Sequence, residues 1–422
     1  MNCHSIIGML FSLTALVSYV NYKYIKLPKS IGITLVTLFL MLILTIGKYL
    51  NKEIEIFINN FLLNINFDYT FLHGMLSFLL FAGALHINVM DLKKQKLIII
   101  SLATISVIIS TTIIAYLTYI LTKYFDINLS FSTCLIFGAL ISPTDPIAVL
   151  GILKIIKVPK TLELKITGEA LFNDAMAVVL FFIACSLTYN NTKNIFFNLD
   201  IIIFFLQQSL GGIFLGLILG LICSKFLKNI DDYEIAIIIT LSIVTGGYTL
   251  SNEIQTCGPI VMVISGLIIG NSIKKGNMNK ETQIRFYSFW ELLDEILNTI
   301  LFVLIGIEFI EISFNYKIFI LSILIILITL LSRWISVIIP ITMLSNFKKF
   351  KHDTIIVMTW GGLRGGISIA LALSIKDIYN YNIIITITYF VVIFSIIIQG
   401  LTIKPLLEYI LIKQKNIKKN TP

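Results

Sequence analysis

Apolar runs of about 20 residues recur from one end of this 422-residue chain to the other. A helix needs roughly 20 apolar residues to cross the hydrocarbon core of a bilayer. Hydrophobic residues make up 57% of the chain and charged residues only 13%, whereas a soluble protein usually carries about 25% charged residues. The sequence therefore predicts an all-α polytopic membrane protein.

The runs predict thirteen membrane-spanning helices in a single transmembrane domain over 1–422, with no soluble domain and no long linker. The stretch 51–68 is expected to be an interfacial helix, because Glu53 and Glu55 precede an apolar face. The predicted spans are 6–21, 31–50, 69–89, 97–121, 129–152, 161–188, 200–224, 234–251, 257–273, 288–310, 318–343, 353–375 and 383–410.

The basic residues predict how the chain is oriented. Of the 32 Lys and Arg residues, 23 fall in the connections after odd-numbered spans or in the C-terminal segment, and 6 fall in the connections after even-numbered spans. Basic loops face the cytoplasm, so we expect the N-terminus outside and the C-terminus inside, in a bacterial inner membrane. This topology, rather than nucleic acid, accounts for the net charge of +9.

The five cysteines are scattered and form no CxxC pair. The sequence therefore predicts neither a disulfide framework nor a structural metal site. We expect no cofactor. No Ser/His pair or HExxH motif lies within a span, so nothing indicates an intramembrane hydrolase or another enzyme.

Five ionisable residues lie within predicted spans. A charge at the centre of a bilayer costs from about 2.5 to more than 10 kcal/mol, depending on the reference state. Charged residues therefore persist within spans for a function or because they pair with one another. The five in this chain are Asp145, Glu169, Asp174, Arg333 and Arg364.

The fifth span contains the sequence SPTDP at 142–146. Two prolines in four residues cannot continue a helix without losing backbone hydrogen bonds, so the span should unwind there. Secondary transporters place ion sites at such interruptions, where carbonyls and the Asp145 carboxylate can face a cation. The alternative is a structural kink in which Asp145 caps the next half-helix.

The sixth span carries GEALFND at 168–174. Glu169 and Asn173 share one face of a helix, and Asp174 is turned about 100° from Asn173. Asp174 can therefore face a cavity while Glu169 meets a cation, either Arg333 or Arg364. The alternative is that all these charges only pin helices together.

The twelfth span reads WGGLRGG at 360–366, and four glycines around Arg364 weaken a helix. This span is predicted to be a second interrupted helix. Spans 4–6 and spans 11–13 would then form an inverted repeat, each with a broken middle span.

Span 10 begins with WELLDE at 290–295. We interpret its acids as a solvated helix start, where the helix dipole favours them. The alternative is that they line a funnel that attracts cations.

Together these motifs resemble the sodium/proton exchanger family, in particular the bacterial monovalent cation:proton antiporters related to animal sodium/hydrogen exchangers. The resemblance extends over nearly the whole chain. It rests on LLFAGALHINVMDL, SPTDPIAVL, GEALFNDAMAVVLF, FWELLDEILNTILFVLIGIE, WGGLRGGISIALALS and IIIQGLTIKPLLE, which occur in the family's order.

The resemblance implies an antiporter fold in which spans 5 and 12 cross at their unwound middles. A mobile core, about 97–188 and 318–410, would pack against a dimerisation part, about 6–89 and 200–310, of a homodimer.

The resemblance also assigns roles to individual residues. Asp174 would bind either a sodium ion or a proton, with Asp145 and the Thr144 carbonyl completing the cation site. Asn173 would mark the electroneutral branch of the family. Glu169 would pair with Arg333, and Arg364 would stabilise the unwound part of span 12.

Ala170 departs from many relatives, which carry Ser one turn before the cation-binding Asp. Because Ala170 offers no oxygen ligand, the choice among sodium, lithium and potassium stays open. The expected function is exchange of a monovalent cation for a proton, for pH and sodium homeostasis. The alternatives are a cation-coupled symporter of a small organic solute and a cation channel.

Overall fold

The computed structural model describes residues 3–50, 52, 67, 70–156, 158, 160–189, 199–228, 230–276, 278–311, 315–344, 352–375 and 381–420. The predicted interfacial helix at 51–68 falls almost entirely outside these residues. Within them there is no β-strand, only one isolated bridge between two residues. The all-α prediction is confirmed.

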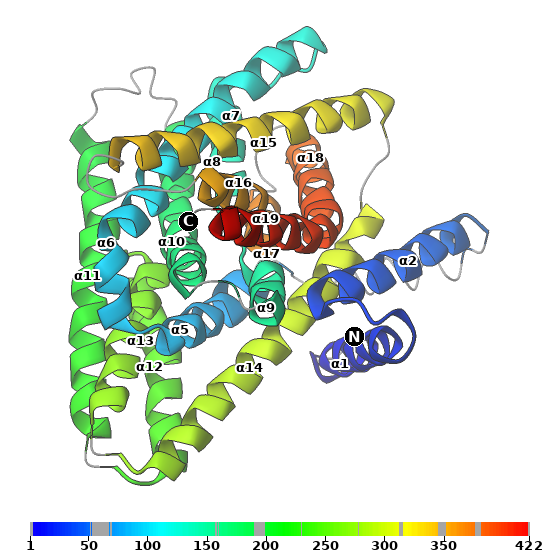
Figure 1. Cartoon of the computed structure of the whole chain (residues 1–422). Coiled ribbons are helices and arrows are strands. Elements are labelled where there is room, and N and C mark those ends of the chain that lie inside the picture. The colour runs from blue at the N-terminus through cyan, green and yellow to red at the C-terminus, as the bar shows by residue number, and fades with distance from the viewer. Residues whose placement is uncertain are drawn as a thin grey trace.

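Each of the thirteen predicted spans corresponds to a helix or to a pair of consecutive helices (Figure 1). The helices are α1 (Cys3–Val20), α2 (Lys29–Leu50), α5 (Leu76–His86), α6 (Val89–Ala103), α7 (Ile105–Tyr124), α8 (Phe131–Ile141), α9 (Ile147–Ile156), α10 (Lys160–Tyr189), α11 (Leu199–Leu227), α12 (Tyr233–Glu253), α13 (Gly258–Lys275), α14 (Lys280–Ile307), α15 (Tyr316–Leu344), α16 (His352–Trp360), α17 (Gly366–Leu373), α18 (Tyr381–Phe394) and α19 (Gly400–Asn420).

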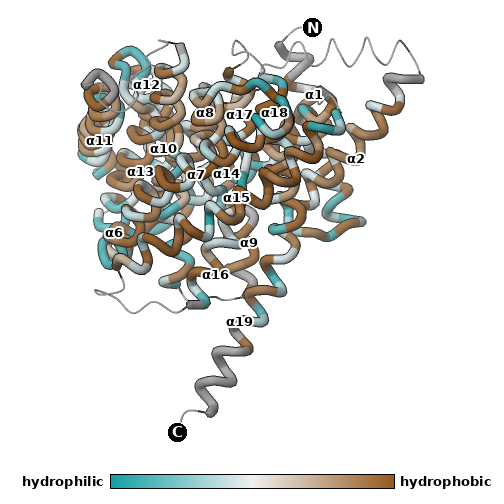
Figure 2. Tube along the Cα trace, turned by 90° about the horizontal axis from the view of Figure 1, so that it is seen from above, coloured by the Kyte–Doolittle hydropathy of each residue, from teal (hydrophilic) through white to brown (hydrophobic). Residues whose placement is uncertain are grey.

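Seven of the described helical segments are long and apolar enough to cross a membrane on length and composition alone. Figure 2 shows hydrophobic residues along nearly every helix, with hydrophilic residues mostly near helix ends. One such segment, Val89–Tyr124, contains both α6 and α7, which are separated only at Thr104. The predicted fourth span is therefore longer than expected and interrupted once.

The helices pack in two sets. One set joins α6, α7, α8, α10, α15, α16, α17 and α18, and the other joins α1, α2, α5, α11, α12, α13 and α14. The long helix α14 crosses the molecule from α12 to α1 and α2 (Figure 1). Between the two sets, α14 contacts α17, and α10 contacts α5, α11 and α13.

The second set contains helices that approach each other very closely. A side chain at Gly216 of α11 would lie 2.9 Å from the Val261 carbonyl of α13. A side chain at Gly270, on the other side of α13, would overlap the Leu85 carbonyl of α5. Only glycine permits such contact between backbones, so α5, α11 and α13 form a tightly packed unit.

Candidate functional site

The fifth span is interrupted where the two prolines predict it. The helix α8 ends at Ile141 and α9 begins at Ile147. Asp145 Oδ1 accepts a hydrogen bond from the Ile147 amide at 2.9 Å, which is the contact of a helix cap. The carboxyl group also lines a cavity. The structure therefore shows the helix cap, and the role of Asp145 at a cation site stays a prediction.

The twelfth span is interrupted between α16 and α17, and the two interruptions cross. The Asp145 amide donates a hydrogen bond to the Leu363 carbonyl at 2.7 Å, and the two residues form an antiparallel bridge. A side chain at Gly365 would overlap the Asp145 carboxyl group. Glycine at 365 is thus required for the close approach of the two segments, and the predicted crossing is confirmed.

Arg364 connects the two interruptions. Its guanidinium donates to the carbonyls of Ser142, at 2.5 Å, and Pro143, at 2.8 Å. These carbonyls lost their helical partners when α8 ended. Arg364 was expected to stabilise its own segment; the side chain stabilises the other one instead, because the crossing brings the free carbonyls of α8 beside it.

Two polar residues that sequence reasoning missed support the segment around Arg364. Ser395 Oγ accepts a hydrogen bond from the Arg364 amide at 2.8 Å and donates to Gln399 at 2.6 Å. The Gln399 amide donates in turn to the Trp360 carbonyl at 3.2 Å. The available signal was their polarity within the apolar run of span 13, since buried polar groups are nearly always hydrogen-bonded.

Glu169 and Arg333 lie against each other in the interior. Arg333 donates to Glu169 Oε1 at 2.5 Å, and the two side chains are only 5% and 2% exposed. Arg333 also donates to the Met358 carbonyl at 3.2 Å. The structure thus places together the pair that the resemblance implied, with α10 supplying the acid and α15 the base.

Asn173 fastens α10 to the first interruption. Its Nδ2 donates to Thr144 Oγ1 at 2.7 Å, and both residues are buried. The next residue, Asp174, is different: none of the ion pairs among the described residues includes it. A carboxyl group within a membrane span without a cationic partner is costly, so Asp174 stays the first candidate for a functional residue.

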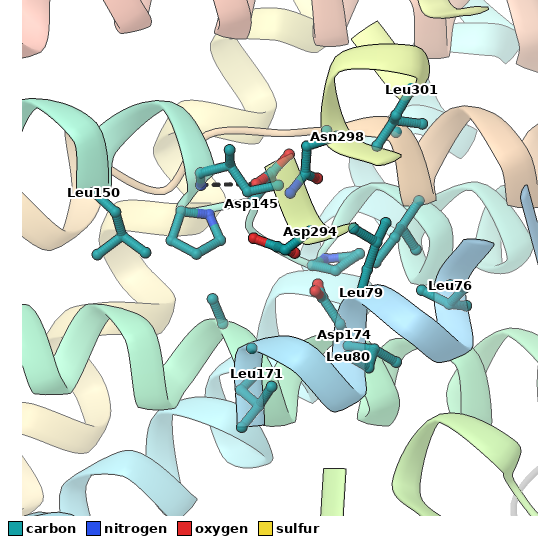
Figure 3. Close-up of a pocket in the computed structure, with 18 of the residues that line it drawn as sticks. Leu76, Leu79, Leu80, Asp145, Leu150, Leu171, Asp174, Asp294, Asn298 and Leu301 are labelled. Atoms are coloured by element: carbon teal, nitrogen blue, oxygen red, sulfur yellow. Dashed lines mark hydrogen bonds between the residues drawn. The ribbon is translucent and has the colours of Figure 1, made fainter. Parts of the chain in front are cut away.

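Asp174 and Asp145 line one cavity of about 150 Å³. Figure 3 shows the side chains of Asp145, Asp174 and Asp294 converging on this cavity. Ala170 contributes to the wall, as do several leucines. Among the described residues, no group of three or more His, Cys, Asp or Glu side chains lies close enough to hold one metal ion.

The small cavity adjoins a larger one of about 830 Å³, and Asp294 and Asn298 line both. Basic residues also line the larger cavity, namely Lys26, Lys29 and Lys404. Lys26 and Lys29 belong to the connection after the first span, and Lys404 was counted with the C-terminal segment; charge counting places both regions on the cytoplasmic side. The candidate site therefore lies next to the cavity that these lysines line.

Comparison with known proteins agrees with this geometry. The family model described as sodium/hydrogen exchanger, transmembrane, matches residues 11–409. The Na(+)/H(+) antiporter NhaP of Pseudomonas aeruginosa is 39% identical over 417 residues, which cover 96% of each chain. The chain belongs to the sodium/hydrogen exchanger family.

Other members of the family are similar over most of their length. The Na(+)/H(+) antiporter NhaH of Halobacillus dabanensis is 32% identical over 395 residues, covering 92% of this chain and 93% of the relative. The structure of the sodium proton antiporter MjNhaP1 from Methanocaldococcus jannaschii matches with a TM-score of 0.74 at 20% identity, covering 96% of this chain and 98% of that one. The latter likeness supports the fold.

One interpretation of this family member's sequence was wrong. The acids at 290–295 were expected at a solvated helix start, but α14 begins at Lys280, so they lie well inside it. Glu291 and Glu295 are exposed, and Glu295 pairs with Lys29 at 2.6 Å. Asp294 instead faces the cavity. The alternative, a funnel that attracts cations, stays a prediction, and it can involve Asp294, which the 3.6-residue period turns away from its exposed neighbours.

Proposed function

We propose that this chain is a secondary antiporter that exchanges a monovalent cation for a proton, with sodium as the first candidate and lithium and potassium as alternatives. One observation carries the proposal: Asp174 and Asp145, neither in an ion pair among the described residues, line a cavity where two interrupted helices cross. The names of the relatives as Na(+)/H(+) antiporters support it.

In this mechanism Asp174 binds either the cation or a proton. Asp145 and the Thr144 carbonyl provide further oxygen atoms for a hard cation. The hydrogen bond between Asn173 and Thr144 fixes α10 against the interruption, so that both carboxyl groups stay at the same cavity. The transported ions are the substrates, and the cycle uses no cofactor.

Coupling follows from the cost of an uncompensated charge. A core with Asp174 charged and empty is unfavourable in the hydrophobic barrier, whereas a core loaded with sodium or with a proton can cross. Competition for one carboxylate exchanges one charge for one, so the cycle is electroneutral. Asn173 adds no second charge to be carried.

The moving unit is proposed to be the core at about 97–188 and 318–410, and the static unit the dimerisation part at about 6–89 and 200–310. The packing of the helices mostly within two sets supports this division. The crossing hydrogen bonds make the two halves of the core move together. Homodimer formation through the dimerisation part remains a proposal.

The antiporter is proposed to lie in a bacterial inner membrane, with the N-terminus outside and the C-terminus in the cytoplasm. The excess of lysine on alternate connections supports this orientation. Because the larger cavity is lined by lysines of that side, the described conformation corresponds to an inward-open state.

The test uses a pH-sensitive dye in acidified everted membrane vesicles, to which sodium, lithium or potassium is added separately. We expect dequenching with sodium or lithium, and its loss in the Asp174→Asn variant at equal amounts of folded protein. Wild-type exchange in Asp174→Asn would overturn the proposal. No response of the wild type to any cation would favour the symporter, tested by solute uptake, or the channel, tested by currents.

A further inference from the structure

The carboxylate Asp294 stands at the same cavity as Asp174 but belongs to a different set of helices. Its helix, α14, packs with α1, α2, α5 and α12, whereas Asp174 lies on α10 and Asp145 at the start of α9. Asp294 and Asn298 are four residues apart on α14, so they share one face. That face lines both the small cavity and the larger one.

Asn298 adds an independent sign of a ligand. Its side chain is only 7% exposed, and its Oδ1 atom is buried without a hydrogen-bond partner among the described residues. The Asn298 side chain also shares with Asp294 the face of α14 that lines the two cavities. Burying an unsatisfied polar atom is costly, and a cation bound beside Asn298 would give this oxygen a partner.

The chemistry of this pair suits a cation. A carboxylate and an amide oxygen are hard oxygen ligands, the kind that alkali cations and other hard cations take. Ala170, in the wall of the same cavity, supplies no oxygen at the position where many relatives carry Ser. An oxygen donor on the facing helix is available to a cation approaching Asp174.

The three carboxylates do not act as one cage. No group of three such side chains among the described residues is close enough to hold a single metal ion. Asp294 and Asn298 line both cavities, whereas Asp174 and Asp145 line only the small one. A cation that enters from the lysine-lined cavity therefore meets Asp294 and Asn298 before Asp174 and Asp145.

We propose that Asp294 and Asn298 form an entry site that receives the monovalent cation from the cytoplasmic side and delivers it to Asp174. This inference rests on the proposed antiport function. Because α14 belongs to the part that stays in place, the core moves Asp174 away from Asp294 when it turns outward. The entry site therefore serves the inward-open state alone, and cation affinity differs between the two faces of the membrane.

The test compares the cation concentration for half-maximal exchange on the two faces. Everted vesicles present the cytoplasmic face to added sodium, and right-side-out vesicles present the external face. For Asp294→Asn, and separately Asn298→Leu, we expect an increase of at least about fivefold on the cytoplasmic face, from loss of one ligand, and less than about twofold on the external face. Size-exclusion chromatography in detergent verifies folding.

Glu291→Gln is the matched control, because Glu291 is an exposed acid on the same helix that lines neither cavity. It should leave both values unchanged. If Asp294→Asn raised the half-maximal cation concentration equally on both faces, or on neither, the entry site would be overturned. The antiport function would still stand in that case, because the wild type exchanges cations. Absence of wild-type exchange from both faces would overturn the antiport function as well, so the two failures are distinguishable.

Discussion

Glu169 and Asp174 are two acids on the same helix with opposite surroundings. Glu169 is 2% exposed and bonded to Arg333. Asp174, little more than one turn further along α10, faces a cavity and has no ion pair among the described residues. The difference shows how one helix can carry a structural acid and a transporting acid. A carboxylate that is bonded to a fixed arginine cannot exchange ligands, whereas a carboxylate that faces a cavity is free to bind an ion or a proton.

The largest effect is expected when the ion pair is broken. Glu169→Gln leaves the buried guanidinium of Arg333 uncompensated, which should lower the free energy of unfolding by about 3–5 kcal/mol. Thermal unfolding of the protein in detergent measures this change. Asp174→Asn should leave stability unchanged or raised, because it removes a charge that has no ion-pair partner in the membrane interior.

The double variant Glu169→Gln/Arg333→Gln provides the control for this comparison. It removes both charges and should recover part of the lost stability. If Asp174→Asn were as destabilising as Glu169→Gln, the proposed separation of the two acids into a structural and a transporting residue would be wrong.

The second prediction disturbs the cavity and spares the ion pair. In Gly365→Ala the new methyl group overlaps the Asp145 carboxyl group, so the crossing must shift, at a cost of about 1–3 kcal/mol. We expect exchange in everted vesicles to fall strongly while the protein stays folded. Gly246→Ala on α12 is the control, since nothing lies within 4 Å of the added atom; equal exchange in both variants would contradict the role of the crossing.

The third prediction concerns competition between sodium and protons at Asp174. Protonation removes the charge that binds the cation, so lowering the pH on the side of added sodium should raise the half-saturating sodium concentration. The half-saturating sodium concentration should rise by at most about tenfold per pH unit, because one sodium ion displaces one proton. Exchange assays at a series of pH values measure this slope; a half-saturating concentration independent of pH would exclude a shared carboxylate.

The smallest effect is expected at Ala170, which lies on α10 between the two acids and lines the cavity. Ala170→Ser offers the cation one more oxygen and should lower the half-saturating concentration a few-fold, corresponding to about 0.5–1 kcal/mol. Sodium, lithium and potassium titrations show whether selectivity changes too. An unchanged value for all three would mean that residue 170 does not reach the ion.

Much of the fold could be predicted from the sequence, because the bilayer imposes length and hydropathy on every span. The interruptions could be predicted as well, because proline and glycine act locally on the backbone. The direction of individual side chains could not. Whether Asp294 faces water or a cavity depends on how α14 rotates against α17, and hydropathy carries no information on that rotation.

The residues of the candidate site could be predicted where they fall within the family's motifs. Glu169 and Arg333 lie together as the resemblance implied, while the ligand roles of Asp174, Asp145 and Thr144 stay predictions. The target of Arg364 was missed because its partners, Ser142 and Pro143, are 222 and 221 residues away in the chain. The resemblance implied that the two segments cross, but it did not imply which hydrogen bonds the Arg364 side chain makes at the crossing.

The same distance has a consequence for synthesis of the protein. The carbonyls of Ser142 and Pro143 are satisfied by Arg364, which leaves the ribosome long after the fifth span has been made. Until the twelfth span is inserted, these carbonyls have no such partner in an environment that tolerates few free polar groups. The N-terminal half of the chain therefore cannot complete these hydrogen bonds until the C-terminal half has been inserted. A truncated product that ends before span 12 should be an early target of membrane quality control.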